Sequence, residues 1–209
     1  MIVKQAYQVY QTPENLQRHM LGTAALANIV LENWIGIEID KDAIVKACTI
    51  HDIAKPMKFD LAKQAQYGMS ENDIEALRKL QNRIKTTFGD NEHKATIGIA
   101  REIGCSPDVV MYIDNLEWEY VPKLLAARDI SSLIPIYCDM RIGPKGILSL
   151  GERLHEIKER VKGDDYEENV RNGNILEQEI KKNSNVDINS IADNQLTAKF
   201  DALLKLELA

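Results

Sequence analysis

The stretch TPENLQRHMLGTAALANIVLENWIG, residues 12–36, contains the strongest fold signal in the chain. Thr12 as an N-cap and Pro13 at the first helical position are typical of a helix start, and Gly36 is typical of the residue just past a helix end. Between these signals apolar side chains recur about every 3.6 residues, which predicts an α-helix with one buried face. This apolar stripe comprises Leu16, Met20, Ala24, Ala27, Val30, Leu31 and Trp34.

Similar signals recur along the rest of the chain. Capping residues such as Ser70 and stop residues such as Gly104 mark further helices, and no stretch alternates apolar and polar residues convincingly enough to predict a strand. The sequence therefore predicts an all-α fold, a multi-helix bundle of about eight helices. Beyond the first helix, the predicted helices span about residues 40–56, 70–87, 91–103, 106–116, 129–140, 149–162, 165–182 and 187–208.

The composition excludes several classes of protein. A length of 209 residues, 44% of them hydrophobic, suits one domain with a sizeable core. The net charge is −6 and no basic run exceeds a pair, which disfavours an extended nucleic acid or an anionic membrane as partner. No apolar run is long enough for a membrane span or a signal peptide. Three scattered cysteines fit no disulfide or zinc motif, so we expect a cytoplasmic protein.

Four polar side chains are expected to face inward from apolar surroundings. His19 lies beside the apolar stripe of the first helix, and His51 lies on the buried face of the second, followed directly by Asp52. Asp139 ends the almost wholly apolar run at residues 133–138. Because burying an unpaired imidazole or carboxylate is costly, a shared divalent metal ion is a common solution. A mixed nitrogen and oxygen ligand set suits Mn, Fe, Co, Ni, Zn or, less well, Mg.

These residues together resemble the motif of the HD superfamily of metal-dependent phosphohydrolases. The family pattern is a His on one helix, a His-Asp pair on the next helix and a distant Asp on a later one. Here Arg18-His19 is followed by HDIAK at residues 51–55, then by His93 and finally by Asp139. The HDIAK stretch resembles the HDIGK version of the motif, with Ala where Gly is usual, a change that leaves the ligands untouched.

The resemblance implies a domain organisation and a metal site. Residues 1–162 would form a helical bundle of the HD-domain or phosphodiesterase type, and residues 163–209 a C-terminal helical extension packed on the same domain. One divalent metal ion per chain is favoured, with a second left open. The implied metal ligands are His19, His51, Asp52 and Asp139.

The resemblance also implies roles for residues around the metal. Asp52 would position or deprotonate the attacking water, and Lys55 would bind the substrate phosphate. Arg18 and Arg141 are further candidates for binding the substrate, the alternative being that both are ordinary surface arginines. His93 is expected to act as an acid or base near the site or as a partial ligand of a second metal, the alternative being a place on the helix surface.

The leading functional interpretation is an enzyme, a phosphohydrolase that cleaves a phosphomonoester or phosphodiester of a small molecule with metal-activated water. A nucleotide is the favoured substrate, since the chain lacks the basic surface that a polymer would need. The alternatives are a non-catalytic regulatory module that binds a metal or nucleotide, and a di-iron oxygenase of the HD type, for which the four histidines are few. A homodimer is left open.

Four other residues are expected to be structural. His155 lies among charged residues and is expected on a solvated helix face, and Cys138 is expected to fill the core. Trp118 and Tyr120 are expected to close a loop over the core, the alternative being that they cover a substrate ring.

Overall fold

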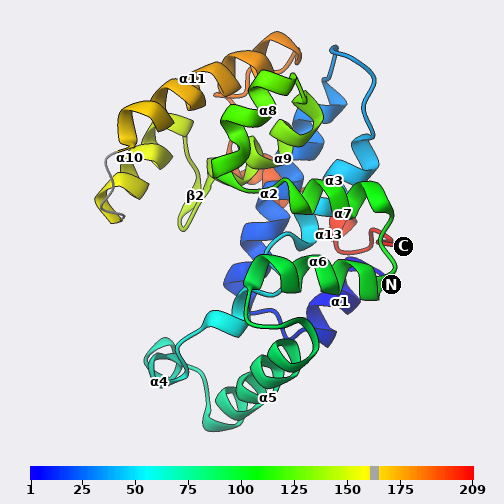
Figure 1. The fold of residues 1–209 in the computed structure, drawn as a ribbon, viewed down its shortest axis with the longest axis vertical. Helices are drawn as coiled ribbons and strands as arrows, with labels where there is room; N and C mark the ends of the chain where they lie inside the picture. The colour runs from blue at the N-terminus through cyan, green and yellow to red at the C-terminus, as the bar shows by residue number, and fades with distance from the viewer. Residues whose placement is uncertain (161–164) are drawn as a thin grey trace.

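A long central helix organises the fold. The computed structural model describes residues 1–160 and 165–209 and is predominantly α-helical. Helix α2 (Glu14–Glu32) runs through the middle of the molecule, and α3 (Lys41–Ile50) and α9 (Ile130–Arg141) pack along it (Figure 1). The prediction of a mainly α-helical fold is therefore confirmed.

The remaining elements surround these three helices. The α4–α5 segment lies at one end of the long axis and α11 lies near the other (Figure 1). The elements not yet named are α1 (Val3–Val9), η1 (Lys55–Lys58), α4 (Leu61–Gln64), η2 (Ala65–Tyr67), α5 (Glu71–Phe88), α6 (Glu92–Ile103), α7 (Pro107–Asp114), η3 (Trp118–Tyr120), α8 (Val121–Ala127), β1 (Ile142–Gly143), β2 (Gly146–Ile147), α10 (Leu150–Arg160), α11 (Tyr166–Lys182), α12 (Asp193–Thr197) and α13 (Phe200–Leu203).

The start of α2 differs by one residue from the prediction. The structure makes Pro13 the N-cap, with Glu14 as the first helical residue. The hydroxyl of Thr12 does not cap the helix. It is buried and has no hydrogen-bond partner among the described residues. The carbonyl of Pro13 instead accepts hydrogen bonds from the backbone N–H groups of Leu16 and Gln17.

The prediction of one helix over residues 187–208 is wrong. The structure has two short helices there, α12 and α13, both packed on α2. The buried apolar residues of this segment follow no single helical stripe, so tertiary packing decides its shape. They are Ile188, Ile191, Leu196, Leu203 and Leu208.

The two ends of the chain pair with each other beside α1 (Figure 1). Ile2 and Glu207 form an antiparallel bridge, and the N–H of Val3 donates to the carbonyl of Leu206 at 3.0 Å. Helix α1 was not predicted because its partners lie about 200 residues away in sequence, beyond the reach of any local pattern.

A short β-hairpin, with two strands of two residues each, follows α9 directly. Residues 142–143 pair with 146–147 in antiparallel register, so Pro144 and Lys145 form the turn. No strand was predicted from the sequence here, because strands of two residues are too short to show an alternating pattern.

Membrane insertion is not indicated by any helix in the described ranges, since none combines the length and apolar character that a span requires.

The side chain of Leu26 on α2 is fully buried, so truncating it should destabilise the folded protein strongly. We expect Leu26→Ala to lower the free energy of unfolding by about 3 kcal/mol, because truncation loses apolar burial and leaves a cavity. Ile37→Ala, at a residue that is 65% exposed, should change it by no more than about 0.5 kcal/mol. Urea denaturation in the presence of EDTA measures both; equal effects would contradict the placement of Leu26.

Candidate metal centre

Three helices bring two histidines and one aspartate to a single point. His19 comes from α2, His51 caps the C-terminal end of α3, and Asp139 lies in the last turn of α9. Asp139 Oδ1 is 2.9 Å from His19 Nε2 and 3.1 Å from His51 Nε2. One ligand atom from each residue lies within 4.8 Å of the others, so the cluster could hold a metal ion.

A backbone contact orients the ring of His51. Its Nδ1 lies 2.9 Å from the carbonyl oxygen of Cys48, one turn earlier in α3. Because a carbonyl oxygen can only accept, Nδ1 carries a proton and donates it in this hydrogen bond, which directs Nε2 toward Asp139. A second contact of this kind is the usual support for a metal-binding histidine, because it fixes the tautomer and the ring angle.

Burial and charge set the protonation of the cluster. Burial lowers the pKa of His51, but the carboxylates of Asp52 and Asp139 outweigh it and raise that pKa to about 9. Burial likewise raises the pKa of Asp139, but the charge of His51 and hydrogen bonds from both histidines hold it well below its usual range. Without a metal ion, a proton on His51 therefore partly compensates the charge of the half-buried Asp139 carboxylate.

Asp52 and Lys55 lie beside the cluster. Asp52 Oδ2 is 3.7 Å from His19 Nε2 and 3.8 Å from His51 Nε2, and Lys55 Nζ lies 2.5 Å from the same oxygen. Since α3 ends at His51, the following turn lets adjacent His51 and Asp52 face the same point. Burial lowers the pKa of Lys55, but the charge of Asp52 more than reverses that effect.

The cluster opens onto a cleft of about 1450 Å³. One wall of the cleft is acidic and includes Glu92 and Glu117, and burial raises the pKa of both. His93 lies on this wall, with Nδ1 3.0 Å from Glu117 Oε1 and Nε2 3.1 Å from the backbone oxygen of Asp114. The structure thus brings His93 to the cleft but pairs it with the wall.

Several cations also line the cleft. Arg18 is exposed on α2, next to His19, and Lys145 is exposed in the turn of the β-hairpin. Arg153, from α10, is largely buried and its Nη1 pairs with Glu156 at 2.7 Å. Sequence reasoning identified Arg18 but not Lys145 or Arg153, since a lysine in a turn and an arginine in a charged helix look like ordinary surface residues.

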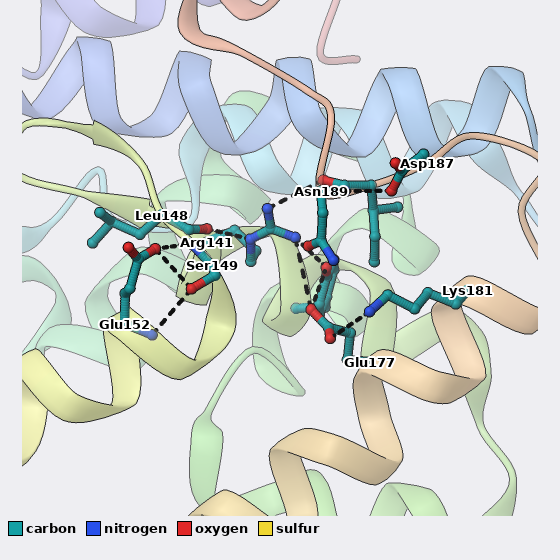
Figure 2. Close-up of polar contacts among 10 residues, drawn as sticks. Arg141, Leu148, Ser149, Glu152, Glu177, Lys181, Asp187 and Asn189 are labelled. Carbon is teal, nitrogen blue, oxygen red and sulfur yellow. Dashed lines mark hydrogen bonds and ion pairs between the residues drawn. The ribbon is translucent and has the colours of Figure 1, made fainter.

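Arg141 does not lie in the cleft, although the sequence suggested it as a substrate ligand. Its guanidinium is buried and donates to the carbonyl of Leu148, to the hydroxyl of Tyr137 and to the carbonyl of Ile188 (Figure 2). Glu177 of α11 lies 4.0 Å from it. A side chain with these partners joins α9 to the hairpin, α11 and the C-terminal segment, so we assign Arg141 a structural role.

The remaining residues of interest are mainly structural. His155 is exposed on α10 and lies 3.6 Å from Glu159, and Cys138 is fully buried in the core. Trp118 lines the cleft and its indole N–H donates to Asn169 of α11 at 2.8 Å, whereas Tyr120 is exposed.

Comparison with known proteins provides no further guide to this site. No protein-family model, curated protein or solved structure matches the chain.

Metal binding at this site should release a proton. The metal-free site holds a proton on His51 up to about pH 9, and a metal ligand must be the neutral imidazole. Below that pH we expect Mn²⁺ affinity to rise by up to about tenfold per pH unit, and to level off above it. Calorimetry from about pH 6.5 to about pH 8.5, in buffers of different ionisation enthalpy, counts the protons released.

The matched control is His155→Ala, which removes an exposed imidazole on α10. It should leave both the affinity and the proton count unchanged. Binding without proton release, or with an affinity independent of pH, would contradict the assignment of His51 as a ligand.

Proposed function

We propose that this protein is a metal-dependent phosphohydrolase of the HD type, acting on a small phosphate ester. The observation that carries the proposal is the convergence of His19, His51 and Asp139 at one point, beside the ion pair of Asp52 and Lys55. A metal-ligand set, a carboxylate and a cation then line the same cleft. The resemblance of the sequence to the HD motif supports the same function.

The donor set fits a divalent metal ion. Two imidazole nitrogens and a carboxylate oxygen already lie close together, and Asp52 is near enough to both imidazoles to be the fourth ligand. Such a ligand set suits Mn, Fe, Co, Ni or Zn and, less well, Mg, and we favour one ion per chain. When bound, the ion would supply Lewis acidity toward the phosphoryl oxygens and would lower the pKa of water.

Lys55 and Asp52 would act on different parts of the reaction, Lys55 on the phosphate and Asp52 on the attacking water. The ammonium of Lys55 would bind a phosphoryl oxygen, because a nearby cation stabilises the charge that accumulates there during hydrolysis. As Lys55 turns toward the phosphate, the Asp52 carboxylate would be free to orient the attacking water and accept its proton. The new bond would join the water oxygen to phosphorus as the ester P–O bond breaks. The leaving oxygen would take a proton from solvent, and Asp52 would return to solvent the proton that it accepted.

His93 would shape the substrate-binding wall. Both of its ring nitrogens are engaged, one by Glu117 and the other by the backbone of Asp114. Proton transfer from His93 would require Nε2 to leave Asp114. The acidic wall around it suits hydrogen-bond donors of the substrate, such as the hydroxyl and amino groups of a nucleoside.

The test is phosphate release from a panel of nucleotides and phosphodiesters with Mn²⁺, Co²⁺, Ni²⁺ and Mg²⁺. We expect Asp52→Asn to lower kcat by at least about hundredfold, because it removes the proton acceptor. Lys55→Gln should lower kcat/KM by about tenfold or more, because it removes the phosphate-binding cation. Lys41→Gln makes the same charge change at an exposed residue of α3, outside the cleft, and should leave the kinetics unchanged.

Three results would contradict the proposal. Activity that survives Asp52→Asn would exclude the assigned proton acceptor. Nucleotide binding without turnover would favour a regulatory module instead. Two iron ions per chain together with oxygen consumption would favour an oxygenase.

A further inference from the structure

The hairpin that follows Asp139 is held rigidly over the cleft. On one side Arg141 donates to the carbonyl of Leu148, just after β2 (Figure 2). On the other, the Asp193 carboxylate accepts the N–H of Ile147 at 2.9 Å. Gly146 has a φ of 127°, and a Cβ there would lie 2.5 Å from that carboxylate. The turn residue Lys145 is therefore carried on a fixed support rather than a free loop.

The hairpin also contacts the helix that provides His19. A Cβ on Gly22 of α2 would lie 3.3 Å from the side chain of Ile142, at the base of the hairpin. Arg18 precedes Gly22 by one helical turn, so both residues lie on the same face of α2. Arg18 therefore lies on the hairpin side of the metal centre.

Three cationic groups in this part of the cleft have unused binding capacity. Within residues 1–160 and 165–209, Lys145 and Arg18 have no hydrogen-bond or ion-pair partner. Arg153 pairs through Nη1, but its buried Nε–H has no hydrogen-bond partner in the described chain. A buried N–H without an acceptor is costly, so an acceptor supplied by a ligand would stabilise it.

Two acidic groups beside the hairpin and Arg153 already have partners. Asp193 accepts a backbone N–H from the hairpin, and Glu156 is paired with Arg153. The carboxylates of the acidic wall, Glu92 and Glu117, come from α6 and the segment before η3 rather than from the hairpin or α10. The hairpin, α10 and α2 thus contribute cations to the cleft, and Asp193 of α12 adds one carboxylate beside the hairpin.

We infer that Lys145 and Arg153, together with Arg18 next to His19, form a second anion-binding subsite in the cleft. The inference rests on the proposed function, since it places the reacting phosphate at the metal and Lys55. The substrate class is then a small molecule with two phosphate groups, one at each subsite. The cleft volume of about 1450 Å³ exceeds that of a typical small-molecule pocket and accommodates such a substrate.

The experiment compares inorganic tripolyphosphate with orthophosphate as probes, by calorimetry on the full chain in EDTA. Working without metal prevents the probe from extracting it and separates this test from the hydrolysis assay. The wild-type chain should bind tripolyphosphate at least about tenfold more tightly than orthophosphate, because the longer anion reaches both subsites. Lys145→Gln should weaken tripolyphosphate binding about fivefold to tenfold and leave orthophosphate binding unchanged.

Arg153→Lys separately tests the contribution of the unpartnered Nε–H of Arg153. It keeps the charge but removes Nε–H, and should weaken tripolyphosphate binding by about fivefold. Lys205→Gln, at an exposed residue outside the cleft, is the charge-matched control for Lys145→Gln and should change binding by less than about twofold. Circular dichroism checks the fold of each variant, and exposed Lys145 keeps the test decisive if Arg153→Lys is unstable.

Two results would overturn the subsite. One is a wild-type chain that binds tripolyphosphate no more tightly than orthophosphate. The other is a Lys145→Gln variant that behaves like Lys205→Gln. By contrast, a chain that shows the expected binding but hydrolyses no phosphate ester would overturn the proposed function and support the subsite as an anion-binding site.

Discussion

The fold around the cleft depends on one half-buried carboxylate, that of Asp139, which lies against two imidazoles. Asp139 Oδ1 lies within hydrogen-bond distance of both His19 and His51, and each of the three comes from a different helix. A carboxylate in such a place is costly unless it is paired with positive charge or a metal ion. The proton on His51 provides this charge without metal, and a divalent ion would replace it. The contacts among these three side chains therefore both join α2, α3 and α9 and form the candidate metal site.

Helix α9 carries two charged residues, Asp139 and Arg141, whose side chains point in different directions. Asp139 faces the metal centre, while Arg141, two residues later, faces the hairpin, α11 and the C-terminal segment (Figure 2). Residues two apart on a helix diverge by about 200°. One turn of helix thus positions both the proposed metal ligand and the hairpin that carries Lys145. The cations proposed to bind a small anion therefore lie in a cleft that also has an acidic wall.

The sequence indicated which three residues meet at one point better than it indicated what lies around them. His19, His51 and Asp139 were recognisable because each is a polar residue in an apolar pattern. Arg141 was misplaced because spacing gives the direction of a side chain but not the elements packed in that direction. Lys145 and Arg153 were missed because a turn lysine and a helix arginine have no local signature. The helices with strong caps were predicted, whereas α1 and residues 187–208 depend on partners distant in sequence, which local patterns do not contain.

X-ray absorption spectroscopy of the zinc-loaded full chain tests the central claim most directly. We expect two imidazole nitrogens, from His19 and His51, with the remaining ligands oxygen, all at about 2.0 to 2.2 Å. His19→Ala should remove one imidazole from this signal. The thiols of two buried cysteines are the competing ligands. Cys48 lies one helical turn before His51, and Cys138 directly precedes Asp139. Sulfur scattering at about 2.3 Å, or an unchanged spectrum in His19→Ala, would contradict the account.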